Sequence, residues 1–259
     1  MIRILKSGIQ TTIQGNRRNG FLSLGFPSSG PMDSLSMMGA NFLTGNKPFD
    51  ASLEMYIQGP VIEFEENLSI AICGADMKPD LNGKSIAQNE LINISKGDIL
   101  SFKPSKNGLI TYLAFGGQIE LPGYLNSTST YLPASLGGFH GRSLKKGDIL
   151  TLKIVRNPLK QNLPNFFKFI QPNKNQIRVL HGPEYPLFKE ADKELFFSNR
   201  YQISNDSNRM GIRLDSDRQL NMDESDIVSS AIIPGTIQIP KDGKPIVMMF
   251  DHQTTGGYA

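Results

Sequence analysis

The side chains that could carry chemistry are most concentrated near the C-terminal end of the sequence. An acid, an imidazole, an amide and two hydroxyls follow one another in Asp251, His252, Gln253, Thr254 and Thr255, and two glycines come next. An acid or imidazole can move a proton, an amide can orient a substrate, and glycine lets another group approach the backbone closely. In a purely structural alternative, Asp251 accepts hydrogen bonds from turn amides and His252 points outward. We interpret this segment as a candidate site.

A β-hairpin is expected to position the segment. Two short apolar runs, 235–239 and 245–250, flank an Asp-Gly pair at Asp242 and Gly243. Such a pair between β-branched runs is a strong hairpin signal, because tight hairpin turns require positive φ angles. The first run contains Gln238, and the second ends at the polar segment.

Two arginines precede this hairpin, and their spacing suggests anion binding. Arg209 and Arg213 are four residues apart, so both would lie on one side of a strand. Arginine binds carboxylate or phosphate through a two-pronged fork. The alternative is that both arginines are simply solvated. Of the two arginines, we favour Arg209 as the functional one.

Two segments nearer the N-terminus are also rich in polar and turn-forming residues. The loop 127–142 contains Tyr131 and could present hydroxyl and backbone N–H groups to an anionic or carbonyl-bearing ligand, although a plain surface loop is the alternative. The turn-rich segment 25–33 contains Ser29 and ends at Asp33, which could cap a following helix.

Composition restricts the class of protein. The 259 residues carry a net charge of +3 with scattered lysines, so neither nucleic acid nor membrane is the expected partner. No apolar run approaches the roughly 20 residues that a membrane span needs, and the N-terminus lacks a signal-peptide pattern, so we expect a cytoplasmic protein. The single cysteine, Cys73, excludes an internal disulfide framework, and with only three histidines no metal site is predicted.

Many short apolar runs separated by turns predict a mainly β fold, an antiparallel barrel or sandwich. Helices are expected at 35–42, capped by Asp33 or Ser34, and at 186–195. Asn82-Gly83 and Asn107-Gly108 are hairpin signals. The strands are expected at residues 2–14, 61–64, 68–72, 86–94, 99–102, 109–115, 177–180, 200–203 and 210–214.

Internal echoes and a shift in composition suggest two subdomains. Lys-Gly-Asp-Ile-Leu occurs at 96–100 and again at 146–150, each time as a turn that leads into a strand. The segment 157–176 is rich in proline, asparagine and lysine, and we interpret it as a connection whose phenylalanines dock on a domain. We therefore expect a β-rich N-terminal subdomain at 1–156 and a C-terminal β-barrel subdomain at 177–259. Cys73 is expected to be a buried strand residue.

Four segments carry a family resemblance. The run PGTIQIPKDGKPIVMMFDHQTTGGY at 234–258 resembles the signature of the biotin-dependent carboxyltransferase family. SSGPMDSLSMMGANFLTGN at 28–46, STYLP at 129–133 and RMGIRL at 209–214 are similar to further motifs of the same family. The resemblance implies a cyclophilin-like antiparallel β-barrel architecture with two subdomains. Members of the family continue for several dozen residues past the Gly-Gly-Tyr, which implies a truncated C-terminal subdomain here.

The resemblance implies the C-type subunit of an ATP-dependent 5-oxoprolinase complex, which opens 5-oxo-L-proline to L-glutamate. Its partners would be a B-type subunit of related fold and a lactam-hydrolase subunit, with ATP used by the complex and any biotin carried by a partner. Residues 78–85 miss the P-loop pattern, so no nucleotide motif is visible in this chain. Two alternatives remain open: a urea-type biotin-dependent carboxyltransferase, and a non-catalytic antagonist of a histidine-kinase inhibitor.

The motifs also imply a site in a groove between the subdomains. Asp251, Gln253 and Arg209 are the expected catalytic residues, with Arg209 holding an anionic group. The expected substrate-binding residues are Ser29, Asp33, Tyr131, Gln238 and Thr254.

Overall fold

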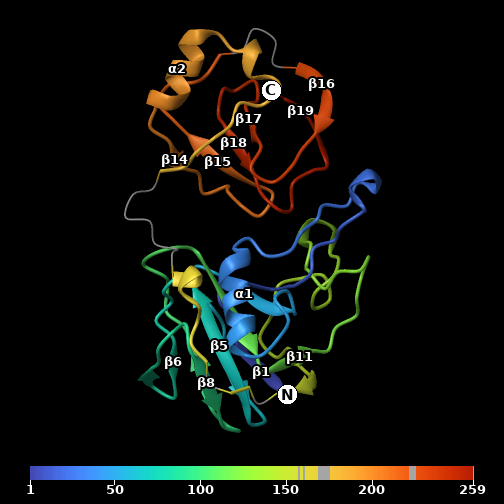
Figure 1. The fold of residues 1–259 in the computed structure, drawn as a ribbon, viewed down its shortest axis with the longest axis vertical. Coiled ribbons are helices and arrows are strands. Elements are labelled where there is room, and N and C mark those ends of the chain that lie inside the picture. The colour runs from blue at the N-terminus through green and yellow to red at the C-terminus, as the bar shows by residue number, and fades with distance from the viewer. Residues whose placement is uncertain (157, 160, 169–175, 222–225, 259) are drawn as a thin grey trace. The chain divides into compact units, whose positions relative to one another are not determined.

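The computed structural model describes residues 1–156, 158–159, 161–168, 176–221 and 226–258. It divides into two compact units, of which the first is Met1–Arg18 with Ser29–Asn173 and the second is Asn19–Ser28 with Lys174–Ala259. The fold is mainly β with antiparallel strand pairing, as predicted (Figure 1). No helix within the described residues is long and apolar enough to cross a membrane.

Among its described residues, the first unit contains three antiparallel sheets. The larger sheet consists, in spatial order, of β12 (Ile149–Leu150), β1 (Ile2–Lys6), β4 (Val61–Phe64), β9 (Ile99–Ser101), β6 (Asp80–Leu81) and β7 (Lys84–Ser85). The second consists of β2 (Gln10–Gln14), β3 (Ser52–Tyr56), β10 (Ile110–Phe115), β5 (Leu68–Gly74) and β8 (Leu91–Ile94). A small third sheet pairs β11 (Gly117–Ile119) with β13 (Leu152–Val155).

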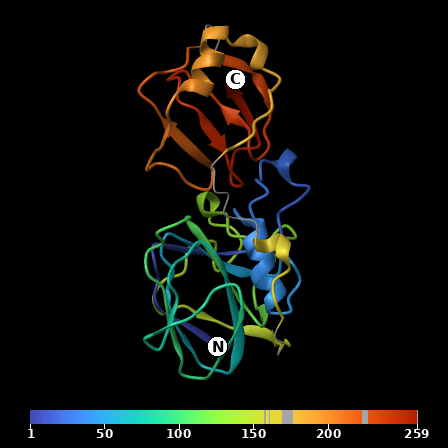
Figure 2. The same ribbon diagram turned by 60° about the vertical axis from the view of Figure 1, so that its left-hand side comes forward.

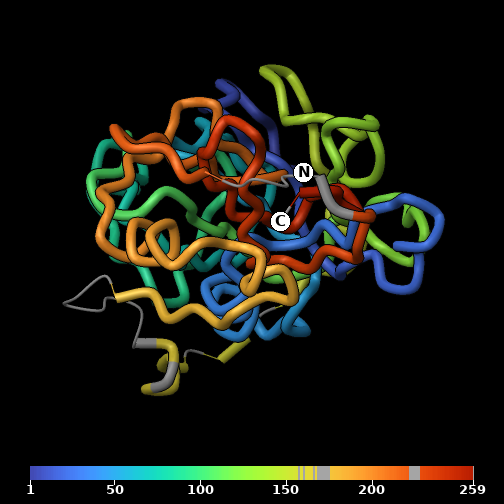
Figure 3. The backbone as a smooth tube through the Cα atoms, turned by 90° about the horizontal axis from the view of Figure 1, so that it is seen from above, coloured from blue at the N-terminus to red at the C-terminus, as the bar shows by residue number. Residues whose placement is uncertain are grey.

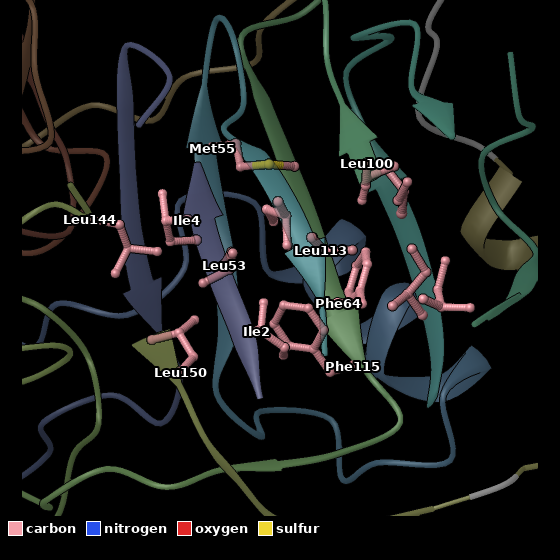
Figure 4. Close-up of a cluster of buried hydrophobic side chains, with 14 of the residues drawn as sticks. Ile2, Ile4, Leu53, Met55, Phe64, Leu100, Leu113, Phe115, Leu144 and Leu150 are labelled. Atoms are coloured by element: carbon pink, nitrogen blue, oxygen red, sulfur yellow. The ribbon is translucent and has the colours of Figure 1, made fainter. Parts of the chain in front are cut away.

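The main core of this unit is built from alternating side chains of the two larger sheets. Ile2 and Ile4 of β1 and Ile62 and Phe64 of β4 alternate along their strands and are fully buried, as expected when one face of a strand meets the interior. Figure 4 shows Ile2, Ile4 and Phe64 of one sheet gathered with Leu53 and Leu113 of the other. Each fully buried side chain of this kind contributes about 1.5–3 kcal/mol to folding through the hydrophobic effect.

Helix α1 (Ser34–Leu43) covers the outer face of the second sheet (Figures 1 and 2). It begins where predicted, because Asp33 Oδ1 accepts the Ser36 amide at 3.0 Å and so caps the first turn. Apolar residues of α1 bury Cys73 of β5 together with Tyr112 of β10. Burial raises the pKa of the Cys73 thiol to about 12, and the nearby Asp33 carboxylate adds to the shift. The prediction that Cys73 is a buried strand residue is confirmed.

The repeated Lys-Gly-Asp-Ile-Leu motif forms the same turn twice, as predicted. Asp98 Oδ2 accepts the Ser95 amide and Asp148 Oδ2 accepts the Lys145 amide, each at 2.7 Å. The glycine before each aspartate has a φ near 90°. Each turn then leads into a strand of the larger sheet, β9 or β12, whose leucine is buried in the core.

The second unit holds a small sheet with the spatial order β14 (Gln202–Ile203), β15 (Gly211–Asp215), β18 (Ile246–Met248) and β17 (Ile237–Gln238). A separate pair joins β16 (Asp226–Ala231) to β19 (Thr255–Tyr258). The expected helix at 186–195 occurs as a short 3₁₀ turn (Tyr185–Leu187) followed by α2 (Glu190–Ser198). The path of this part of the chain can be followed from orange to red in Figure 3. Among the described residues these pairings form open sheets rather than a closed ring.

Several expected elements differ from the structure. The single strand expected at 2–14 is two strands, β1 and β2, which belong to different sheets. Only Leu91–Ile94 of the expected strand at 86–94 is a strand. The expected strand at 177–180 is wrong, because those residues have no regular structure and Leu180 is 97% exposed. Strand β3 was not predicted, although all but its last residue are buried.

The two other hairpin signals have different outcomes. Asn82-Gly83 joins the paired strands β6 and β7, as predicted. Asn107-Gly108 is wrong as a hairpin, because the strands before and after it, β9 and β10, lie in different sheets.

The connecting segment expected at 157–176 is described only in part, because residues 157, 160 and 169–175 lie outside the described residues. One of its phenylalanines, Phe167, packs with the α1 cluster, and its ring centre lies 6.2 Å from that of Phe42. Phe169 and the side chain of Phe166 fall outside the description.

Candidate functional site

The predicted C-terminal hairpin is present in the second unit. Strands β17 and β18 pair antiparallel, with Ile237 opposite Val247 and Gln238 opposite Ile246. Gly243 supplies the expected positive φ of 68°, and the Asp242 carboxylate accepts the Lys244 amide at 3.1 Å. The hairpin loop is longer than a two-residue turn, and it positions the polar segment directly after β18.

A cavity of about 300 Å³ lies along this hairpin. Its wall includes a row of residues across three neighbouring strands, in which Arg213 of β15 and Gln238 of β17 are both paired with Ile246 of β18. Polar side chains, two methionines and the exposed Tyr258 complete the wall. The lining residues are Asn208, Met210, Gly211, Arg213, Gln238, Pro240, Asp242, Ile246, Met248, Gln253 and Tyr258.

Two amide side chains meet in the wall of this cavity. The buried Gln238 accepts a hydrogen bond from Gln253 Nε2 at 3.2 Å and directs its own Nε2 to the Tyr258 carbonyl at 3.4 Å. Glycine at 256 leaves room for this arrangement, because a Cβ there would lie 2.1 Å from Gln238 Nε2 and 2.4 Å from Ile232 Cδ1 and would displace these side-chain ends. The Gly-Gly pair after the polar segment therefore lets β19 pack closely on the Gln238 side chain.

Arg209 and Asp251 form a buried ion pair. The Arg209 Nε donates to Asp251 Oδ2 at 2.8 Å and Nη2 donates to Oδ1 at 3.3 Å, while the residues are only 8% and 1% exposed. The Asp251 amide also donates to the Arg209 carbonyl at 2.9 Å. The guanidinium charge is thus balanced inside the protein. The pair ties the chain after β18 to the chain before β15, which suits a positioning role.

The other members of the polar segment differ in exposure. His252 is 1% exposed, so the expectation that it points outward is wrong; its Nδ1 contacts the Gln253 carbonyl. Gln253 is exposed and Thr254 is half-buried, so both side chains can be reached from solvent. Arg213 is exposed in the cavity wall, in contrast to the buried Arg209, and the two arginines do not act as a pair.

The N-terminal candidates belong to the first unit, where their side chains have internal partners. Ser29 is fully buried and its Oγ accepts a bond from Arg18 at 3.2 Å. The Asp33 carboxylate caps α1, and its amide donates to the Tyr112 hydroxyl at 3.0 Å. That hydroxyl also bonds the buried Glu54 carboxylate, so a network rather than a bare turn holds this segment.

The loop that contains Tyr131 is fixed to strand β2 and to the residues that follow it. Three of its hydroxyls, on Ser127, Ser129 and Thr130, are buried and bonded to carbonyls of residues 13 and 16. The idea that these hydroxyls face a ligand is therefore wrong. Tyr131 is half-buried and forms a short antiparallel bridge with Leu136.

The structure thus groups five of the eight expected site residues in the second unit and three in the first. Gln238 and Gln253 share one cavity, next to the Arg209–Asp251 pair at the end of β18. Their convergence with Ser29, Asp33 and Tyr131 on one groove stays a prediction. Two cavity residues, Asn208 and Tyr258, were not predicted from the sequence. Arg213 was ranked below Arg209, because the spacing of the two arginines does not show which of them is neutralised by a carboxylate.

Two further candidate ligands for the described residues are phosphate and metal. The segment at 78–85, which was compared with a P-loop, contains the β6–β7 hairpin rather than a strand-to-helix turn. Within the described part of the chain, no group of three or more His, Cys, Asp or Glu side chains could hold a metal ion.

The fold and the cavity define a β-sheet protein with a small polar site, whose amides and arginine suit a carbonyl- or carboxylate-bearing molecule. Residues 24–259 match the family model described as "Carboxyltransferase domain, subdomain A and B", and the chain belongs to this family, which confirms the resemblance noted in the sequence.

Two curated relatives illustrate the range of the family. The chain is 34% identical to the C-type subunit of 5-oxoprolinase from Escherichia coli K12 over 259 residues, which are all of this chain and 82% of the relative. It is 34% identical to urea amidolyase of Saccharomyces cerevisiae over 223 residues, which are 82% of this chain and 12% of that enzyme.

Solved structures show the same fold. The urea amidolyase of K. lactis matches the whole chain with a TM-score of 0.86 and 32% identity, and the match covers 17% of that chain. The protein TTHA0988 matches with a TM-score of 0.85 and 27% identity, over all of this chain and half of the other.

Proposed function

We propose that this chain is the C-type subunit of an ATP-dependent 5-oxoprolinase complex, which opens the cyclic amide of 5-oxo-L-proline to give L-glutamate. The observation that carries the proposal is the pair of amide side chains, Gln238 and Gln253, in a small cavity of a chain similar along its whole length to the corresponding 5-oxoprolinase subunit of Escherichia coli. The complex, rather than this chain alone, would be the enzyme, and a cytoplasmic location goes with its use of ATP.

The chemical task explains why amide donors are useful. A lactam is a poor electrophile, and its carbonyl oxygen gains negative charge when a nucleophile adds to the carbon. Gln253 Nε2 carries two hydrogens and gives one to Gln238, so the second can be donated to the substrate carbonyl. The Thr254 hydroxyl is a second donor in the same segment. Donors held in place before the reaction stabilise such charge effectively.

Asp251 and Arg209 would support this chemistry through their ion pair. Because each is the other's charged partner in the interior, we propose that they fix the position of Gln253 and Thr254. Any role of Asp251 in taking up a proton would require the pair to open. The remaining three candidates would support substrate binding indirectly, by fixing loops of the first unit; they are Ser29, Asp33 and Tyr131.

ATP and biotin would act on other members of the complex. The buried hydroxyls of the 127–142 loop and the hairpin at 78–85 do not fit a phosphate, so we assign nucleotide use to a partner. A B-type subunit of related fold and a lactam-hydrolase subunit are the proposed partners, and any biotin would be carried by one of the partners.

A second candidate is a urea-type carboxyltransferase. It is favoured by the similarity to urea amidolyase, which reaches 35% identity in the Lachancea kluyveri relative and a TM-score of 0.86 in the solved structure. Urea also presents a carbonyl between two nitrogen atoms, which the same pair of glutamines could hold.

Reconstitution with partner proteins distinguishes these functions. The chain is co-expressed with a B-type subunit and a lactam-hydrolase subunit, and the purified complex is assayed for 5-oxoproline-dependent ATP hydrolysis and for glutamate. A parallel assay supplies urea, bicarbonate and a biotin carboxylase. We expect glutamate only when all subunits are present. Turnover of urea alone would favour the second candidate, and tight binding to the B-type partner without turnover of either substrate would indicate a regulatory protein.

A further inference from the structure

Arg213 supplies a positive charge in the cavity wall that the proposed chemistry has not used. Its backbone is held on both sides, since its amide donates to Ser207 Oγ at 3.0 Å and its carbonyl accepts the Ser204 amide at 2.9 Å. The side chain is exposed and lines the cavity. Among the ion pairs of the described residues, the buried carboxylate of Asp251 goes to Arg209 and the carboxylate of Asp215 goes to Lys244. Neither of these neutralises Arg213.

The strand register places Arg213 two strands away from Gln238, on the same face of the sheet. Arg213 and Gln238 flank Ile246 across three neighbouring strands. Adjacent strands are about 4.8 Å apart, so the backbones of Arg213 and Gln238 are roughly 10 Å apart. Both side chains line the same cavity, whose volume of about 300 Å³ suits a small organic molecule. Gly211, which lies two residues before Arg213 in β15, leaves the floor of the cavity without a side chain.

We propose that Arg213 binds the carboxylate of a ligand whose amide carbonyl lies at Gln253 and Gln238. The cavity then selects small molecules that carry a carboxylate close to an amide, and Arg213 is the residue that determines this specificity. The choice of ligand class rests on the proposed function. A guanidinium can meet a carboxylate with two parallel hydrogen bonds, whereas a lysine offers only a point charge. The buried Arg209 cannot serve in this way while it is paired with Asp251.

Ligand-observed NMR on the full chain tests this assignment without any partner protein. The two probes are 5-oxoproline, which has a lactam and a carboxylate, and 2-pyrrolidinone, which has the lactam alone. The variants are Arg213→Gln and Arg213→Lys, and Arg200→Gln is the matched control because Arg200 is exposed just before β14 and lies outside the cavity lining. The wild type and the three variants are first compared by circular dichroism.

We expect Arg213→Gln to weaken binding of 5-oxoproline by about 10- to 100-fold, which is the range of a lost charged hydrogen-bonding partner. Arg213→Lys should restore part of that loss, Arg200→Gln should bind like the wild type, and 2-pyrrolidinone should bind equally weakly to all four proteins. Unchanged binding of 5-oxoproline by Arg213→Gln, an equal loss in Arg200→Gln, or no binding of 5-oxoproline by the wild type would overturn the assignment. The proposed function fails separately, when an assembled complex turns over no 5-oxoproline although Arg213-dependent binding is intact.

Discussion

Removal of the Asp251 carboxylate should destabilise the second unit strongly. In Asp251→Ala the Arg209 guanidinium would remain in the interior with its two-pronged partner gone, and the two residues are 8% and 1% exposed in the wild type. Breaking one side of a buried ion pair costs about 3–5 kcal/mol, because the other charge stays desolvated. That is a large part of the roughly 5–15 kcal/mol that typically stabilises a domain.

The measurement is urea-induced unfolding, followed by circular dichroism. Asp215→Ala is the matched control, because Asp215 also pairs with a cation, Lys244, but at an exposed position where ion pairs contribute little. If Asp251→Ala alone leaves the unit unfolded, the double variant Arg209→Met/Asp251→Leu provides a second test, since it removes both charges of the buried pair. It should be clearly more stable than Asp251→Ala.

Equal stability losses in Asp251→Ala and Asp215→Ala would refute this reasoning. So would a double variant that is no more stable than Asp251→Ala. Either result would mean that the Arg209–Asp251 pair does not fix the chain around the cavity, and its proposed positioning role would have no basis.

Three further predictions follow from particular contacts. Gly256→Ala should displace Gln238, because the added Cβ would lie 2.1 Å from Gln238 Nε2; a crystal structure of the variant, or loss of 5-oxoproline binding, checks this. The Cys73 thiol should react with a disulfide reagent at pH 8 only after unfolding, since its burial raises its pKa to about 12; equal reaction rates with and without urea would contradict it. The hydrogen bond from Arg142 lowers the pKa of Asp148 in the folded protein. The ionised Asp148 carboxylate therefore contributes its full stabilisation at pH values above the ordinary pKa of 3.8, and this stabilisation is lost as the pH falls below that value. Asp148→Asn should therefore flatten the loss of stability in that range, and unfolding curves of the two proteins at pH 5 and pH 3 measure the difference.

Local sequence signals predicted those parts of the fold that depend on local physics. Asp33 predicted the start of α1 because a capping carboxylate acts on amides two or three residues away. Asp242-Gly243 and the two Lys-Gly-Asp turns were predictable for the same reason, since each needs only a positive φ and a nearby carboxylate.

Features that depend on distant partners were not predictable in this way. The apolar pattern at 177–180 resembles a strand, but no described strand pairs with it, and Leu180 remains 97% exposed. The neutralisation of Arg209 depends on Asp251, which lies 42 residues later in the chain. The sequence therefore pointed to the polar segments, but it could not show that Arg209 forms a buried ion pair with Asp251 or that Arg213 lines the cavity.

Turnover by the assembled complex with Gln253→Ala tests the central claim most directly. Gln202→Ala serves as the control, because Gln202 is also an exposed glutamine of the second unit but lies in β14, outside the cavity lining. With equal assembly of the complex, we predict that Gln253→Ala lowers kcat by about 10²–10³, the effect of a lost donor to a developing oxyanion. Gln202→Ala should retain wild-type turnover. The substrate in this assay is whichever of 5-oxoproline and urea the complex accepts. Wild-type turnover in Gln253→Ala would contradict the claim that this cavity is the reacting site.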